Sequence, residues 1–62
     1  MKEYYWAVEV APWVLHMYES RTLAKHYAKT REQFIGQLLS RDFEIIKSKG
    51  FKIIIPEYQY KD

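Results

Sequence analysis

One stretch, residues 20–39, constrains the fold of this chain more than any other, because it is the longest segment with a regular apolar period. Placed on a helix at about 100° per residue, its apolar side chains fall within an arc of about 160°, and most of its polar side chains fall opposite. The apolar set is Leu23, Ala24, Tyr27, Ala28, Phe34, Ile35, Leu38 and Leu39, and the polar set is Lys25, His26, Lys29, Glu32 and Gln33.

Arg31 interrupts this apolar arc, and the sequence around it predicts a break between two helices. Residues 30–33 have the form of a capping box, in which a hydroxyl and a glutamine three residues later satisfy free backbone donors. Ser20 is likewise a favourable N-cap for a first helix over about residues 21–29. We therefore expect two helices that meet near Thr30.

Residues 3–10 and 13–18 alternate between two faces, as half-buried strands do. Valine, tyrosine and tryptophan recur in both stretches, which favours extended structure. Ala11-Pro12 interrupts the alternation, because proline cannot donate a hydrogen bond to a sheet. A hairpin around Pro12 is the simplest connection, and a single long strand bent at Pro12 is the alternative.

Two interpretations are open for residues 40–50. In the favoured one, the second helix continues to about residue 48 and Gly50 ends it. In the other, residues 42–47 and 51–56 form a hairpin in which Gly50 takes a positive φ. The apolar run 51–55 is predicted as a final strand buried on both faces, and Pro56 ends it.

These patterns together predict one α+β domain over residues 1–62, in the order strand–strand–helix–helix–strand, with the helices packed on a short antiparallel sheet. A chain of 62 residues buries only about 60% of its unfolded surface. We therefore expect it to work with a partner, either another protein or a second copy in a homodimer. The chain has no cysteine, no apolar run near the about 20 residues of a membrane span, and nothing like a signal peptide. A cytoplasmic protein is expected.

Few residues of this chain are suited to catalysis. The serines and threonines fit caps and turns, and the carboxylates are scattered singly, so no nucleophile has a base beside it. His16 and His26 are the only histidines, whereas a metal site needs three or four ligands. We therefore expect no enzymatic activity, no catalytic residue, no metal and no cofactor. Arg31 is expected to form an ion pair with Glu9 or Asp42, because an unpaired buried charge is costly.

Residues 23–38 resemble the helix-turn-helix of bacterial regulators, which has the form L-A-x-x-Y-G-V-S-x-x-T-V-x-x-x-L. The residues that match are Leu23, Ala24, Tyr27, Thr30, Phe34 and Leu38. The chain departs from the pattern at Ala28 and Lys29, and Gly36 weakens a second helix by about 1 kcal/mol relative to alanine. The resemblance implies a DNA-binding regulator, winged if residues 43–55 form a hairpin. Its contacts would be Lys25, Lys29, Arg31, Gln33, Gln37 and Arg41.

A second resemblance is one of architecture. A strand at residues 14–18, followed by a helix opening at Ser20-Arg21 with Ala24-Lys25, is similar to small accessory and inhibitor proteins of phages and mobile elements. This resemblance implies a non-enzymatic module that binds a partner protein, in the host-cell cytoplasm if a phage encodes it.

The aromatic content favours this second function. Eleven aromatic residues (two Trp, six Tyr and three Phe) are more than a core this small can hold at its centre, and Tyr and Trp are enriched at interface hot spots. The candidate partner-binding residues are Tyr4, Tyr5, Trp13, Tyr18, Tyr58 and Tyr60. Protein binding is thus the preferred function, and DNA binding is the alternative.

Overall fold

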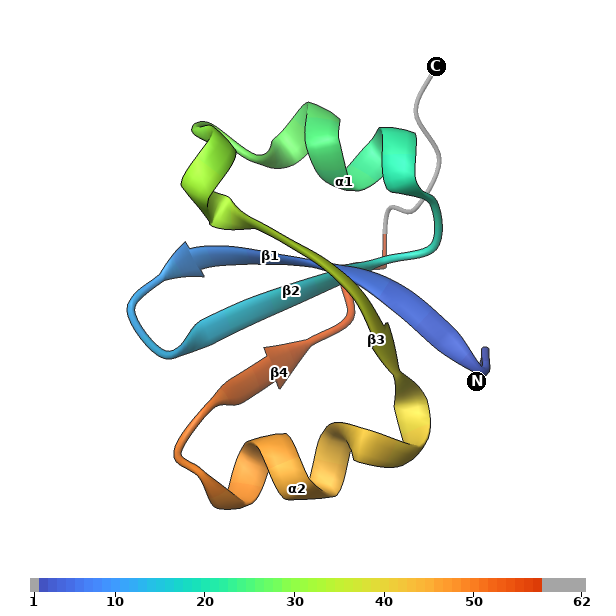
Figure 1. Cartoon of the computed structure of the whole chain (residues 1–62), viewed down its shortest axis with the longest axis vertical. Helices are drawn as coiled ribbons and strands as arrows, with labels where there is room; N and C mark the ends of the chain where they lie inside the picture. Colours follow the sequence, from blue (N-terminus) through green and yellow to red (C-terminus); the bar gives the residue numbers. More distant parts are fainter. Residues whose placement is uncertain (1, 58–62) are drawn as a thin grey trace.

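The computed structural model describes residues 2–57, which form a four-stranded sheet between two short helices (Figure 1). The elements in chain order are β1 (Tyr4–Ala11), β2 (Val14–Tyr18), α1 (Arg21–Tyr27), the 3-10 turn η1 (Arg31–Gln33), β3 (Phe34–Leu39), the 3-10 turn η2 (Ser40–Asp42), α2 (Phe43–Ser48) and β4 (Lys52–Ile54). The predicted α+β class and the rough order of strands and helices are confirmed.

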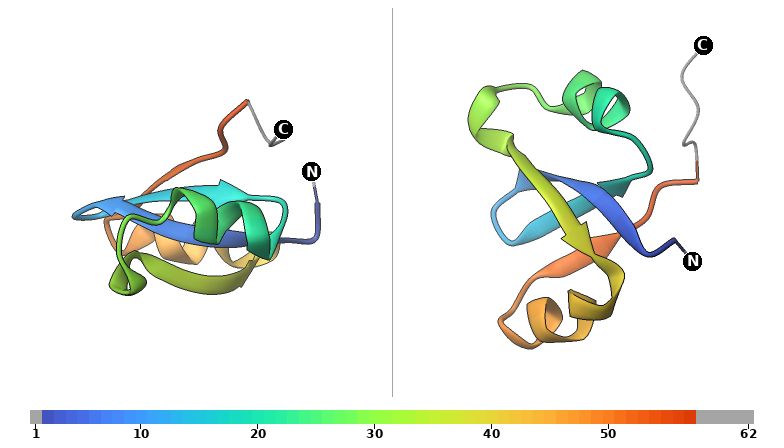
Figure 2. Two further views of the ribbon diagram at one scale, coloured as in Figure 1. Left: turned by 90° about the horizontal axis from the view of Figure 1, so that it is seen from above. Right: turned by 45° about the vertical axis from the view of Figure 1, so that its right-hand side comes forward.

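The sheet is mixed, with the strand order β3-β1-β2-β4. β1 is antiparallel to β2 and β3, whereas β2 and β4 are parallel, so the expectation of a purely antiparallel sheet is wrong for that pair. Two crossovers join parallel strands: α1 leads from β2 to β3, and α2 leads from β3 to β4. They cross the sheet in opposite directions, so the usual right-handed connection places the two helices on opposite faces, as Figures 1 and 2 show.

Each helix covers its own hydrophobic cluster. Successive residues of β1 and β2 divide between the two clusters, because side chains alternate between the faces of a strand. The buried residues on the α2 side are Tyr5, Ala7, Leu15, Met17 and Phe43. Those on the α1 side are Val8, Tyr18, Leu23 and Ala24. The sheet is therefore the middle of three layers.

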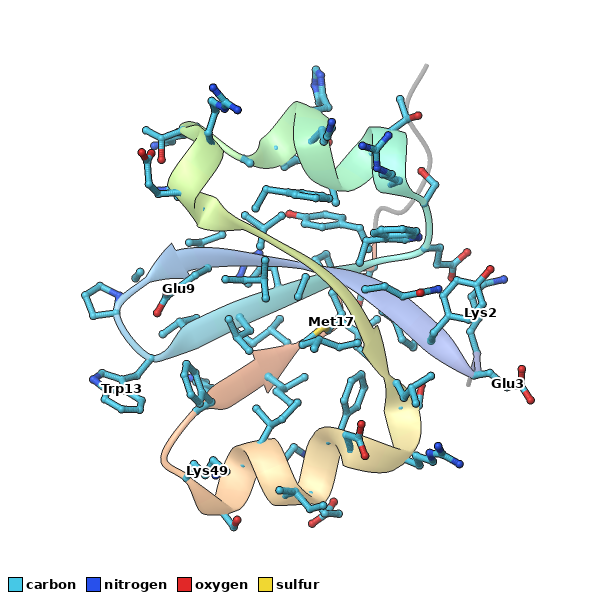
Figure 3. The ribbon with its side chains drawn as sticks, in the orientation of Figure 1. Lys2, Glu3, Glu9, Trp13, Met17 and Lys49 are labelled. Carbon is cyan, nitrogen blue, oxygen red and sulfur yellow. The ribbon has the colours of Figure 1, made fainter. Side chains whose placement is uncertain are left out.

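β1 and β2 form the hairpin expected around Pro12, which excludes the single bent strand. Trp13 occupies the turn with φ 67°. Its backbone N–H donates to Glu9 Oε2 at 3.4 Å, and its ring packs against Phe51 with the centroids 4.8 Å apart. Figure 3 shows Trp13 at this end of the sheet and Glu3 at the other.

The start of the second predicted helix is wrong, because the expected capping box does not form. Thr30 makes no side-chain cap hydrogen bond. The Gln33 side chain instead accepts from the Lys29 backbone N–H at 2.8 Å. This bond closes a tight turn, from which the chain leaves as a strand rather than a helix.

Residues 34–39 are strand β3, not the predicted helix. The free edge of β1 offers these residues a ladder of hydrogen bonds, and a bulge opposite Ala7 and Val8 inserts one extra residue into β3. Because of this extra residue, Phe34 packs in the α1 cluster while Leu38 packs in the α2 cluster. Gly36 lies beside the bulge with φ 118°, a conformation outside any helix.

The C-terminal part follows the favoured interpretation only in being helical up to residue 48, because α2 is a separate helix and not the continuation of one that begins near Thr30. Residues 43–48 are helical, so the competing hairpin is excluded. Gly50, with φ 108°, reverses the chain after α2. The final strand is confirmed in a shorter form, β4, in which Ile53 packs against the α2 cluster. Ile55 is 40% exposed. The predicted burial on both faces is therefore correct for only part of residues 51–55.

Membrane-spanning helices are absent from the described part of the chain: neither α1 nor α2 has the length and apolarity to cross a bilayer.

Candidate functional site

A hollow of about 550 Å³ lies where α1 ends and the chain turns through η1 into β3. We call it the basic hollow; the residues that line it are Arg21, Lys25, Ala28, Lys29, Thr30, Arg31 and Phe34. Four of these seven side chains are cationic and none is acidic. Positive charge is thus concentrated here, in a chain whose formal net charge is only +2.

Helical spacing brings two of the cations together. Arg21 and Lys25 are four residues apart on α1, which places them on one side of the helix, about 6 Å apart along its axis. Lys29 lies after the helix, beyond the extended residue Ala28, and lines the same hollow. Sequence reasoning selected Lys25 and Lys29 but missed Arg21, although the same spacing was the signal that could have found it.

The fourth cation, Arg31, reaches the hollow through the turn after α1. The Lys29 N–H donates to Gln33 Oε1 at 2.8 Å, and the Gln33 N–H donates to the Thr30 carbonyl at 3.1 Å. These two bonds close the turn between residues 29 and 33, which follows α1. Arg31 therefore lines the same hollow as the lysines of the preceding segment.

The expected ion pair of Arg31 with Glu9 or Asp42 does not form. Between residues 2–57 the one ion pair in the structure joins Lys47 Nζ to Glu44 Oε2 at 3.9 Å, on α2. Arg31 needs no buried partner, because it is exposed in η1 rather than placed in the apolar stripe of a helix. All four cations of the basic hollow are exposed, and an anion between them would relieve their mutual repulsion.

Phe34 provides an apolar wall to the hollow. Its ring is half-buried, and Trp6 packs nearly parallel to it, with centroids 6.3 Å apart and an interplanar angle of 16°. Lys25 Nζ lies over the Phe34 ring, 5.6 Å from its centroid. A cation–π contact at an exposed site contributes about 0.5–1 kcal/mol, so Lys25 is held over the ring only weakly.

The structure gathers three of the six residues expected to contact nucleic acid. Lys25, Lys29 and Arg31 line the basic hollow. Gln33 lies in η1, where its side chain is bound to the backbone. Gln37 is exposed on β3. Arg41, in η2 at the far end of β3, borders a separate hollow with Glu3, Leu39 and Ser40.

The helix-turn-helix itself is not present at residues 23–38. Its first helix corresponds to α1, but β3 occupies the place of the recognition helix. Any nucleic-acid contact by this segment would therefore come from the basic hollow and not from a helix inserted into a groove.

The aromatic residues expected to bind a partner are scattered. Tyr4 and Trp13 are exposed by 41% and 56%, but they lie at opposite ends of β1. Tyr5 and Tyr18 are buried, which corrects their assignment to the exposed set. Tyr5 packs on Phe43, and Tyr18 stacks on Tyr27 of α1. The alternation of side chains along β1 and β2 directs the Tyr5 ring into the α2 cluster and the Tyr18 ring into the α1 cluster. Tyr58 and Tyr60 lie outside the described residues.

A second exposed surface lies along the free edge of β3. We call it the β3 edge; it comprises Ile35 and Leu39, exposed by 46% and 36%, with Tyr4 opposite Leu39 on β1. The six residues of β3 carry no charge. The other edge strand, β4, is only three residues long and includes exposed Lys52. Charge and short length protect an edge from pairing with other chains, so β3 is the less protected of the two.

The basic hollow contains groups that can bind an anion, and no histidine or carboxylate is among its lining residues. His16 lies on β2, with Nδ1 3.5 Å from the Tyr18 hydroxyl, and His26 lies on α1. Within residues 2–57 no three His, Cys, Asp or Glu side chains are grouped so that they could hold a metal ion.

Comparisons of the chain with protein-family models, with curated proteins and with solved structures find no match.

Proposed function

We propose that this chain is a small non-enzymatic binding module whose ligand is the sugar–phosphate backbone of a nucleic acid. The observation that supports this proposal is the basic hollow, in which four cations and no carboxylate line one concave surface. Phosphate contacts by lysine and arginine provide most of the affinity of proteins that bind nucleic acids without sequence preference.

The arrangement of the cations favours a polymer over a single small anion. Arg21 and Lys25 lie about one helical turn apart on α1, about 6 Å along its axis, and Lys29 and Arg31 add two cations from the segment that follows the helix. Four cations spread over a helix and a turn suit the regularly repeated phosphates of a strand. One isolated phosphate would engage only some of them.

The test is a salt titration of binding. A labelled oligonucleotide of mixed sequence, single-stranded and as a duplex, is titrated with the protein between about 50 and 200 mM salt, and binding is followed by fluorescence anisotropy. If all four cations contact phosphates, log K should fall with log salt with a slope of about −3 on the single strand. Lys29→Gln should reduce the slope by about 0.7.

The matched control is Lys49→Gln, because Lys49 is an exposed lysine at the end of α2, on the other side of the sheet (Figure 3). This variant should keep the slope of the unmodified chain. Binding that does not change with salt, or equal effects of the two variants, contradicts the proposal. Tighter binding to polyglutamate than to either oligonucleotide also contradicts it, and would favour an acidic protein as the ligand.

The β3 edge supports a second candidate function, that of a small protein-binding module whose edge strand docks on another chain. An uncharged edge strand with exposed apolar side chains can accept a further strand. The partner we propose for this edge is a second copy of the chain in antiparallel pairing. That arrangement brings η1 of one copy to η2 of the other, so Glu32 would approach Arg41 of the second copy.

A further inference from the structure

We infer that the basic hollow takes an unpaired nucleotide of a single-stranded nucleic acid, with the phosphates on its cations and the base against Phe34. This inference rests on the proposed function and specifies its ligand. It follows from three features of the hollow: its concave shape, its apolar wall and the weak hold of Lys25 on the Phe34 ring.

The concave shape favours a single strand. The hollow has a volume of about 550 Å³ and is open to solvent on one side, so a single nucleotide can enter it. In a duplex the bases are stacked inside, so only phosphates and sugars could reach the rim. In a single strand one base can leave its neighbours and enter, as happens in proteins that combine a basic groove with an aromatic surface.

The apolar wall has no role for a ligand that offers phosphates alone. Ala28 and Phe34 line the hollow beside the four cations. Trp6, which packs nearly parallel to Phe34, limits the freedom of that ring and so keeps it ready for contact. A base offers the flat apolar face that this wall can bind, whereas a carboxylate of an acidic protein does not.

Lys25 belongs to both parts of the hollow: it is one of the four cations, and it lies over the ring of the apolar wall. In the free protein its Nζ lies over the Phe34 ring, at 5.6 Å from the centroid, and its side chain is exposed. A base stacked on an aromatic ring binds more strongly than an exposed lysine does. An entering base would therefore displace Lys25 from the ring, and the displaced ammonium would be free to contact a phosphate of the same strand.

The experiment compares three ligands of one length, about ten nucleotides: a mixed-sequence single strand, the same strand with abasic residues, and its duplex. Affinities are measured by fluorescence anisotropy with the unmodified protein at several salt concentrations. Loss of base stacking should weaken binding of the abasic strand about tenfold, and the duplex should bind more weakly than the intact single strand. The salt slopes for the intact and the abasic strand should agree, because their phosphates are the same.

Two variants assign the effect to residues. Phe34→Leu should remove the difference between the intact and the abasic strand while leaving the salt slope unchanged. Lys29→Gln should weaken both strands together and reduce the slope. If Phe34→Leu does not fold, the abasic comparison on the unmodified protein still decides the outcome.

The outcomes separate the inference from the proposed function. Equal affinity for the intact and the abasic strand, or a duplex that binds as tightly as the single strand, overturns the inference and leaves backbone binding in place. Absence of salt-dependent binding to all three ligands overturns both. Stronger binding of the intact single strand, lost in Phe34→Leu, supports both.

Discussion

At the scale of single residues, two backbone conformations with positive φ shape the chain, one in β3 and one in the turn between β1 and β2. Gly36 has φ 118° and accompanies the bulge that directs Phe34 and Leu38 into different clusters. A Cβ at Gly36 would meet no atom within 4 Å, so the requirement for glycine there comes from the backbone alone. Trp13 takes a positive φ without being glycine, and its contact with Phe51 helps to offset the strain of that conformation.

Gly36→Ala should therefore destabilise the protein through backbone strain and not through a clash. The expected loss is about 1–3 kcal/mol in the free energy of unfolding, measured by urea denaturation. The matched control is Gln37→Ala, the exposed neighbour on β3, which should change stability by less than about 0.5 kcal/mol. Equal stability of Gly36→Ala and the unmodified chain would show that this backbone conformation carries no strain.

At the scale of elements, α1 is short and depends on its ends. The helix has seven residues, too few to be stable alone in water. Ser20 Oγ accepts from the Leu23 N–H at 3.0 Å, which satisfies one free donor of the first turn. Leu23 and Ala24 anchor the helix on the sheet. The cap and these two contacts together hold Arg21 and Lys25 of α1 in the basic hollow.

The two hydroxyls expected to cap helices should thus differ in their effect on stability. Ser20→Ala should lower the free energy of unfolding by about 1 kcal/mol, because a cap hydrogen bond is lost. Thr30→Ala should have almost no effect, because Thr30 makes no side-chain cap hydrogen bond. Thermal or urea unfolding of both variants measures the difference. A larger loss for Thr30→Ala would argue for the predicted helix that begins at Thr30 and continues to about residue 48.

At the scale of the whole molecule, the sheet separates two clusters and leaves one unprotected edge. β3 joins both clusters, since Phe34 packs on the α1 side and Leu38 on the α2 side. Its outer edge carries Ile35 and Leu39, which are exposed. In an antiparallel pair of chains this edge would be covered, and the sheet would continue from one copy into the other.

Association through the β3 edge should depend on concentration and should be blocked by a charge. Sedimentation velocity of the unmodified chain should show dimer at high protein concentration. Leu39→Lys should remain a monomer, because a lysine on an edge strand opposes pairing. Ile45→Lys is the matched control: Ile45 is 57% exposed on α2, away from the edge, and this variant should still associate. A monomer at every concentration of the unmodified chain would exclude this interface.

The sequence by itself determined the elements whose signals are local. Alternating side chains identified both strands of the N-terminal hairpin, and Ser20 identified the start of α1. In the second half of the chain, the end of α2 was predicted correctly, because Gly50 marks it in the sequence. The α+β class followed from these elements, because the local patterns identify strands at both ends of the chain and helices between them.

Only the tertiary structure decided the state of residues 34–39 and the composition of the site. In that segment Phe34, Ile35, Leu38 and Leu39 fit a helical stripe, and β3 forms because β1 has an open edge to pair with, which no local pattern reveals. The turn before β3 then returns Arg31 to the cations of α1. Burial of the aromatic residues was equally undecided in the sequence, because alternation shows which side chains share a face but not which face another layer covers.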